Sequence, residues 1–350
     1  MNATLGICTG SAQIIGTRPE QQDAFGFTSL TEVDFIEHGG LLAVVADGVG
    51  GHAHGREASN KAVAAFLQNY LQKPRQVNIP EGLYQALMES NRAVVEFSES
   101  QGESENCGTT LVAAVLHPSS RSLYWIGVGD SRLYFFRGGQ IAQFTMDANL
   151  GGHFIQKVVR GIITRKEMNA EENLHKLTSF LGMKKIGKID RSIRPFQLHE
   201  GDAVLLCTDG VYQALSAEEL AGYGLIEPQQ ACDWLMQAII TKNWENQDNA
   251  TAAMLAFGFK QTANTPVPSP AVSEPEEPTP YKEELLPPAI TVKPRFNKFW
   301  LLGLIAVVIG FGLVWVFIYK ADEPQATNVI PVELPKLKPP VESRKNNLKR

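Results

Sequence analysis

Short apolar runs divide the first 259 residues of the chain, and most of them are bounded by Gly, Asp or Pro. Runs of about four to eight apolar residues with such boundaries are typical of buried β-strands. The runs lie at 41–45, 110–116, 122–126, 132–136, 203–206 and 252–256. Residues 137–140, with two central glycines, predict a hairpin turn.

Other stretches repeat their apolar residues at the spacing of an amphipathic helix, which predicts helices over about 55–72, 81–98 and 228–241. In the first of them, one face is kept apolar by Val63, Phe66, Leu67, Tyr70 and Leu71. Strands occur in runs with paired helices between them, so we expect antiparallel sheets layered with helices rather than parallel βαβ units. The pattern therefore predicts one α+β domain over 1–259.

A second kind of apolar stretch lies near the C-terminal end, where residues 299–319 carry no charge. At about 1.5 Å rise per residue, a helix of this length spans roughly 30 Å of hydrocarbon. Trp300, Trp315 and Tyr319 lie towards its ends, where aromatic belts are found. A buried core helix is the alternative, but such a helix normally keeps a polar face. The stretch predicts a single transmembrane helix.

The charges that flank this stretch predict its orientation. Lys293, Arg295 and Lys298 precede it. It is followed by Lys320, Asp322 and Glu323, and the next basic residue is Lys336. Basic residues accumulate on the cytoplasmic side of membrane helices. We therefore expect a single-pass protein of the cell inner membrane, with the domain of residues 1–259 in the cytoplasm.

The segments on either side of the predicted transmembrane helix are rich in proline. Residues 260–298 combine proline with glutamate, which predicts an extended, disordered linker between the domain and the membrane. Residues 320–350 are basic and proline-rich, and we expect them to be a disordered tail.

Charge and cysteine content narrow the class of protein. Residues 1–259 hold 20 lysines and arginines against 28 aspartates and glutamates. This acidic balance argues against nucleic acid as the main partner, because binding phosphate backbones needs a basic face. The four cysteines are scattered and no secretory signal opens the chain, which indicates reduced thiols in a cytoplasmic domain.

Acidic residues recur in five short glycine-rich or polar segments, at 18–23, 46–52, 128–132, 207–210 and 248–251. Carboxylates brought together repel one another unless they bind cations, and Mg²⁺ and Mn²⁺ prefer such oxygen ligands.

Three of these acids stand at the ends of predicted strands. Asp47 and Asp209 each follow an apolar run and precede a glycine, and Asp248 precedes another run. A single Asp-Gly after a strand is usually only a turn, but three strand-end acids could converge at one edge of a sandwich. The backbone carbonyl of Gly48 could also approach an ion there.

These segments, taken in order, resemble the metal-dependent protein phosphatase 2C family (PPM type) in its bacterial form. The matching stretches are 16–24, 45–52 running to 55–59, 108–110, 127–132, 177–182, 206–210 and 248–251. Each is weak alone, but their order along residues 1–259 is specific. The resemblance implies a four-layer α-β-β-α sandwich of two antiparallel sheets flanked by helices, here followed by the C-terminal transmembrane helix.

The resemblance also implies a site. Asp47 would bridge two Mn²⁺ or Mg²⁺ ions, with Asp209 and Asp248 on one ion and the Gly48 carbonyl on the other. Asp23 would lie beside the pair, directly or through water. Asp130, with Asp209, would hold a weaker third ion.

The implied activity is hydrolysis of phosphoserine and phosphothreonine in proteins. Arg18 would bind the substrate phosphate, because a guanidinium group can donate to two phosphate oxygens. A hydroxide between the two ions would attack phosphorus in line. No phosphoenzyme is needed, so Cys207 need not be a nucleophile.

Several positions depart from the family pattern. Gln22 stands where some relatives carry an acid, and Val49 stands where eukaryotic relatives carry a histidine. His52 could be the leaving-group acid, but a structural or solvent-facing role is the stronger interpretation. A flap of bacterial relatives would correspond to 147–175, and solvated charges there are favoured over contact with a phosphopeptide (Arg160, Arg165 and Lys166).

The interpretation favoured by the sequence is a phosphatase tethered at the cytoplasmic face of the membrane. By analogy, its partners would be a eukaryotic-like serine/threonine kinase and that kinase's substrates. Two alternatives remain open. One is a catalytically weak pseudophosphatase that binds phosphoproteins or senses a signal with the same fold, and the other is a membrane scaffold that acts through the linker and tail.

Overall fold

The computed structural model describes residues 6–49, 54–102 and 107–259, all within one of the two units of the chain, Met1–Val272. The predicted linker, transmembrane segment and tail, and also His52, lie outside the described residues. None of the helices in the described ranges is long and apolar enough to span a bilayer.

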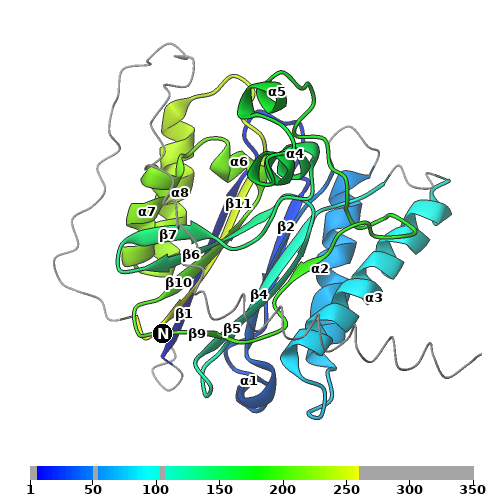
Figure 1. Ribbon diagram of the computed structural model, residues 1–350. Helices are drawn as coiled ribbons and strands as arrows, with labels where there is room; N and C mark the ends of the chain where they lie inside the picture. The colour runs from blue at the N-terminus through cyan, green and yellow to red at the C-terminus, as the bar shows by residue number, and fades with distance from the viewer. Residues whose placement is uncertain (1–5, 50–53, 103–106, 260–350) are drawn as a thin grey trace, which may run out of the picture. The chain divides into compact units, whose positions relative to one another are not determined.

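The strands form two sheets in which all neighbours are antiparallel (Figure 1). The strands are β1 (Ile7–Ile14), β2 (Asp23–Phe27), β3 (Leu41–Asp47), β4 (Leu111–His117), β5 (Ser122–Val128), β6 (Arg132–Arg137), β7 (Gln140–Gln143), β8 (Asp190–Arg191), β9 (Phe196–Gln197), β10 (Ala203–Cys207) and β11 (Ala250–Phe257). The first sheet has the order β1, β11, β10, β6, β7. The second has the order β2, β3, β4, β5, β8, and β9 also pairs with β5.

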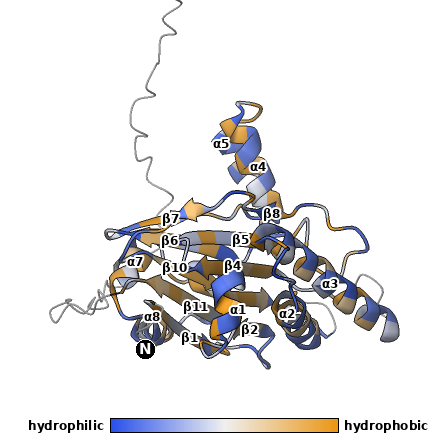
Figure 2. Cartoon of the chain, turned by 90° about the horizontal axis from the view of Figure 1, so that it is seen from below, coloured by the Kyte–Doolittle hydropathy of each residue, from blue (hydrophilic) through white to orange (hydrophobic). Residues whose placement is uncertain are grey.

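Helices cover the outer face of each sheet (Figures 1 and 2). The helical elements are α1 (Val33–Gly39), α2 (Gly55–Leu71), α3 (Ile79–Ser100), α4 (Leu150–Val159), α5 (Arg165–Asn169), α6 (Asp209–Tyr212), α7 (Ala217–Ala221), the 3-10 turn η1 (Gly222–Leu225) and α8 (Pro228–Lys242). The pair α2 and α3 packs on the second sheet, and α8 with the shorter α6 and α7 packs on the first. The predicted four-layer α-β-β-α sandwich is therefore confirmed.

Strand β3 shows why the central strands are unbroken apolar runs. Val44 points outward and packs in the same cluster as Phe66 of α2. Its neighbour Val45 points the other way, into the cluster between the sheets that also holds Leu206 of β10. Successive side chains of a strand face opposite sides, so a strand buried on both faces must be apolar throughout.

The predicted strands and helices agree with observed ones to within a few residues, but five strands were missed: β1, β2, β7, β8 and β9. The hairpin turn is confirmed, since Gly138 and Gly139 have φ of 55° and 77° between β6 and β7. In β1, a side chain at Gly10 would lie 2.2 Å from the Pro228 backbone at the start of α8. This close approach of helix and strand explains a glycine inside a strand.

Two features of the architecture bear on function. The ends of β3, β5 and β10 meet the starts of β2 and β11 at one end of the sandwich. The predicted acidic residues lie at or next to these strand ends. Helices α4 and α5 stand out from the sandwich and have no buried residues (Figure 2).

Candidate metal centre

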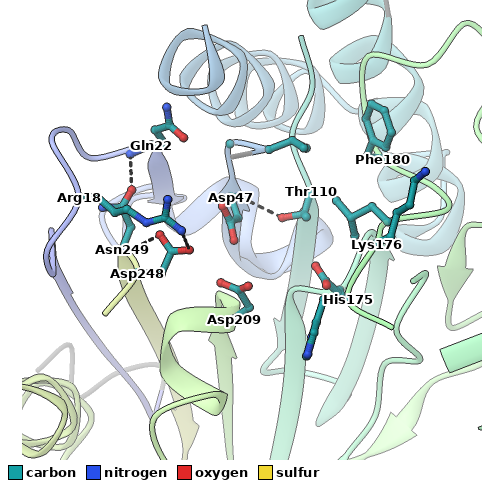
Figure 3. A pocket seen from close by; sticks show the side chains of 14 residues that line it. Arg18, Gln22, Asp47, Thr110, His175, Lys176, Phe180, Asp209, Asp248 and Asn249 are labelled. Carbon is teal, nitrogen blue, oxygen red and sulfur yellow. Dashed lines mark hydrogen bonds and ion pairs between the residues drawn. The ribbon is translucent and has the colours of Figure 1, made fainter. Parts of the chain in front are cut away.

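A pocket of about 700 Å³ opens where the strand ends meet (Figure 3). Four of the five predicted carboxylates line it, together with the predicted phosphate-binding residue and the predicted carbonyl ligand: Asp47, Asp130, Asp209, Asp248, Arg18 and Gly48. The fifth carboxylate, Asp23, is buried directly beside Asp47. The fold thus brings together all seven residues assigned to the site from the sequence.

Asp23 and Asp47 are cross-strand partners, because the first residue of β2 pairs with the last residue of β3. Directly opposed residues of an antiparallel pair share one face of the sheet. Asp47 continues the alternation of Val45, so both carboxyls face the space between the sheets. The Asp47 N–H donates to Thr110 Oγ1 (3.0 Å), and the Thr109 hydroxyl donates to the Asp47 carbonyl (2.8 Å).

The two carboxylate oxygens of Asp23 differ in their hydrogen bonds. Its Oδ2 accepts hydrogen bonds from the hydroxyls of Thr208 (2.9 Å) and Thr251 (2.7 Å). Its Oδ1 is buried without a hydrogen-bond donor among the described residues. Such an oxygen has the environment expected for a cation ligand or for an oxygen bonded to an ion's water.

Gly48 is required by its surroundings. A Cβ atom at this position would lie 2.4 Å from the Gly55 carbonyl oxygen. Its N–H donates to the Gln22 carbonyl (3.1 Å). With no side chain, the backbone that follows Asp47 lies in the pocket wall, as a carbonyl ligand requires.

Asp209 and Asp248 come from neighbouring antiparallel strands of the first sheet. Asp209 begins α6 directly after β10, and Asp248 lies two residues before β11. Gly210 permits their close approach, since a Cβ there would lie 2.1 Å from the Asn249 carbonyl oxygen. The Asp209 carboxylate accepts from Gln213 Nε2 (2.7 Å).

Arg18 reaches the pocket on a loop, where its Nη2 donates to Asp248 Oδ2 (2.6 Å). Asn249, which was not assigned a role from the sequence, holds this loop. Its side-chain oxygen accepts from the Gln22 N–H (2.7 Å), and its side-chain nitrogen donates to the carbonyls of Ile15 (2.8 Å) and Glu20 (3.0 Å). The only sequence signal was its place beside Asp248.

Asp130 lies at the other side of the group, in the loop between β5 and β6. Its Oδ2 accepts from Asn149 Nδ2 (3.2 Å), and Asn149 also caps α4 by accepting from the Gly152 N–H (2.8 Å). Asn149 therefore joins Asp130 to the base of the projecting helices. This residue, too, was missed from the sequence.

Burial and mutual repulsion raise the pKa of every buried carboxyl in the group. Burial is the largest cause at each one. The pKa of Asp47 is raised well above its ordinary value, with further contributions from Asp23 and Asp209. The pKa of Asp23 and of Asp209 is raised to about 6, and that of Asp130 to about 7. The raised pKa values mean that ionising these carboxyls is unfavourable in the metal-free chain. A bound cation would offset this cost, because it supplies the missing opposite charge.

The donor set fits a hard divalent cation. It consists of carboxylate and carbonyl oxygens, the ligands that Mg²⁺ and Mn²⁺ prefer, without thiolate or imidazole in the predicted set. Within the described residues, no three acidic, histidine or cysteine side chains already form a closed ligand cluster. The carboxylates instead line an open pocket, which suits ions that retain several waters.

In the absence of divalent metal, we expect the free energy of unfolding to fall as pH rises from about 5 to about 8. Carboxyls with a raised folded-state pKa bind protons more tightly when folded. Their stabilising contribution is complete below the unfolded pKa of about 4. It is lost as pH rises through about 6 for Asp23 and Asp209, and about 7 for Asp130.

Urea unfolding of the chain in EDTA across this pH range measures the effect. Asp130→Asn should flatten the decline near neutral pH, and Mn²⁺ should restore stability there by replacing protons. A metal-free stability that rises with pH over the same interval would contradict the carboxyl cluster.

Other predicted residues lie apart from the pocket. Arg160, Arg165 and Lys166 do not line it. Burial raises the pKa of Cys207 to about 12, which keeps this thiol protonated and supports the expectation that it is not a nucleophile. The four cysteines are buried and form no disulfide.

His175 and Lys176 line the pocket although no sequence signal had placed them there. They lie in the segment that returns from α5 to the sandwich. No local pattern distinguishes them, since their position depends on how this segment pairs with residues 148–151.

Comparison with known proteins gives consistent results. Residues 12–232 match the family described as protein phosphatase 2C. The serine/threonine phosphatase stp of Listeria monocytogenes is 28% identical over 226 residues, which cover 63% of this chain and 86% of that protein. The serine/threonine protein phosphatase PstP of Mycobacterium tuberculosis is 30% identical over 197 residues, which cover 56% of this chain and 36% of that protein.

Solved structures show the same fold. The PPM Ser-Thr phosphatase MsPP from Mycobacterium smegmatis, crystallised in complex with cacodylate, matches with a TM-score of 0.57 and 28% identity. The match covers 71% of this chain and 98% of that one. The catalytic domain of the serine threonine protein phosphatase PstP, in complex with two manganese ions, matches with a TM-score of 0.55 and 25% identity over 71% of this chain and 97% of that one.

Proposed function

Because the chain belongs to the protein phosphatase 2C family, it is a protein-serine/threonine phosphatase, and we propose that the pocket at the strand ends is its active site. One observation carries the proposal. Carboxylates from four separate strand ends share a pocket with a guanidinium group that can bind phosphate, and the burial of Asp47, Asp130 and Asp209 carries a cost that bound cations would offset.

Enzymes of this family use two Mn²⁺ or Mg²⁺ ions. In this proposal Asp47 would contact both ions, Asp209 and Asp248 would hold one of them, and the Gly48 carbonyl would hold the other. Asp23 would support the pair through Oδ1, which has no donor among the described residues. Asp130 is assigned to a third, weaker ion. When bound, the ions supply the positive charge that acidifies an attacking water and neutralises the phosphate.

Arg18 is the phosphate-binding residue in this proposal. Its pairing with Asp248 orients the guanidinium group at the mouth of the pocket, where its side chain is half exposed. A guanidinium group has five N–H donors, so one can remain with Asp248 while others bind two phosphate oxygens. Asn249 fixes the loop, and Arg18 therefore needs little rearrangement to receive a substrate.

We also propose that the enzyme works at the cytoplasmic face of the inner membrane, on phosphoproteins produced by a eukaryotic-like serine/threonine kinase. The support is the uncharged stretch 299–319 and the basic residues that precede it. The linker 260–298 is long enough to let the domain reach substrates near the membrane surface.

Hydrolysis of a phosphothreonine peptide tests the site and the reaction. The full chain and a fragment of residues 1–259 should both release inorganic phosphate with Mn²⁺, and EDTA should stop both. Metal binding without turnover of any phosphopeptide would instead support a pseudophosphatase.

Membrane orientation has a separate test. A periplasmic-type reporter fused after Arg350 should be active, and the same reporter fused after residue 259 should be inactive. Cytoplasmic location of the reporter after Arg350 would contradict the proposed topology without affecting the assigned chemistry.

A further inference from the structure

Hydrolysis of a phosphoserine or phosphothreonine leaves an alkoxide oxygen, which needs a proton as its bond to phosphorus breaks. A positioned general acid typically contributes about 10²- to 10⁴-fold to such a step. The buried carboxylates of the pocket are assigned to metal and cannot donate while they are ligands. A different proton donor is therefore expected on the pocket wall.

His175 is the one imidazole among the described residues that line the pocket. Figure 3 shows it across the pocket from Arg18, with Asp47 and Asp209 between them. Histidine is the side chain best suited to proton transfer near neutral pH. His54, which follows the metal-binding segment, lies outside this lining and packs edge-on against Phe97 instead.

The backbone of His175 is anchored on both sides although its side chain is exposed. The Gly151 N–H donates to the Leu174 carbonyl (2.7 Å), and the Leu150 N–H donates to the Lys176 carbonyl (2.9 Å). The partner segment is tied in turn to Asp130 by Asn149. His175 is thus held at a defined place relative to the carboxylates, with an exposed side chain in the pocket lining.

We propose that His175 is the acid that protonates the leaving serine or threonine oxygen. The inference rests on the proposed function of this pocket. A water oxygen forms the new bond to phosphorus, and the bond between phosphorus and the side-chain oxygen breaks. The electron pair of that bond goes to the departing oxygen, which takes the proton from the imidazolium ring. The products are inorganic phosphate and a neutral hydroxyl group, and His175 regains its proton from solvent.

The charges around His175 are consistent with this role. Two negative groups, Asp130 and Asp209, line the same pocket as His175. The next residue in the chain, Lys176, adds a positive group to this lining. The substrate phosphate adds negative charge in front of the ring. In this position the imidazolium would lie beside the anionic substrate whose leaving oxygen takes the proton.

The test measures kcat of the full chain, in the presence of Mn²⁺, on two substrates. His175→Gln should lower kcat for a phosphothreonine peptide by about 10²-fold. It should change kcat for p-nitrophenyl phosphate by less than about threefold, because nitrophenolate is a stable anion that leaves without a proton. The peptide activity of the wild type should decline on the alkaline side, and the variant should lose that decline.

Controls separate this role from a structural or metal-binding one. Manganese affinity by calorimetry and the Tm should be unchanged in His175→Gln, and His199→Gln, away from the pocket, should leave both activities unchanged. Lys176→Gln, which removes a neighbouring positive charge from the pocket lining, should affect both substrates equally, because the two substrates carry the same phosphate group.

Four results would overturn the proposal: equal losses on the two substrates, no loss on either, a weakened manganese affinity, or the substrate-selective loss in His52→Gln instead. A wild-type chain inactive on both substrates would reject the proposed function itself, and the inference with it.

Discussion

Asp47→Asn should abolish phosphatase activity and at the same time stabilise the metal-free chain. Asp47 is buried among four other carboxyls, and burial with their repulsion raises its pKa well above the ordinary value. Asparagine has nearly the same shape but no charge, so it removes the repulsion and also the bridging ligand. Loss of electrostatic stabilisation of this kind costs on the order of 10³-fold in kcat or more.

The stability effect should appear only without metal. In EDTA at neutral pH, the Tm of Asp47→Asn should exceed that of the wild type, by about 2–4 °C for each kcal/mol gained. With saturating Mn²⁺ the order should reverse, because only the wild type gains stability from binding the ions. Thermal unfolding with and without Mn²⁺, together with phosphopeptide turnover, measures both effects.

Asp202→Asn is the matched control. Asp202 is also a buried aspartate, 1% exposed, but it lies at the opposite end of β10 and is paired. Its two oxygens accept from Arg137 Nε (2.9 Å) and Nη2 (2.7 Å). Its replacement should lower the Tm and leave manganese binding and specific activity intact. A destabilised Asp47→Asn that retains activity would refute the assignment of the metal centre.

Arg18→Ala should lower kcat/KM for a phosphothreonine peptide by about 10²-fold. Two hydrogen bonds to a charged phosphate are worth about 1.5 kcal/mol each or more, and each 1.4 kcal/mol is about tenfold. Arg18→Lys should recover part of the loss, because lysine keeps the charge but not the planar pair of donors. Inhibition by inorganic phosphate should weaken in the same order.

The pair with Asp248 defines a competing role, in which Arg18 serves only to hold that carboxylate. Manganese affinity distinguishes the two roles. If Arg18 binds phosphate, Arg18→Ala should leave manganese affinity within a few-fold of wild type, and stability nearly unchanged, as for other exposed ion pairs. Arg75→Ala, at an exposed position outside the pocket lining, should change none of these quantities. Unchanged inhibition by phosphate in Arg18→Ala would exclude the phosphate-binding role.

The elements that could be predicted from the sequence are those whose burial leaves a local pattern. Strands β3, β4 and β10 are buried on both faces and are therefore unbroken apolar runs. Strand β1 was missed because one of its faces carries polar residues and because its partner, β11, lies more than two hundred residues later. Strand β2 is five residues long and contains Asp23 and Gly26, so its pairing with β3 leaves almost no pattern of its own.

The same distinction holds for the site. Asp47, Asp209 and Asp248 could be selected from the sequence because each stands at the end of an apolar run in a recognisable segment. Those segments, in their order, also determined the family, since side chains that carry chemistry recur with their local turns. The charge pattern around 299–319 likewise predicts a membrane location from the chain alone.

Only the tertiary structure decided how these residues support one another. The pairing of Asp23 with Asp47, the hold of Asn249 on the Arg18 loop and the link from Asn149 to Asp130 all join segments distant in the chain. His175 entered the pocket for the same reason. Its place depends on backbone hydrogen bonds between residues 148–151 and 174–178, and residue type alone does not indicate that contact. Local sequence therefore determined which chemistry the chain holds, whereas long-range packing decided which groups surround it.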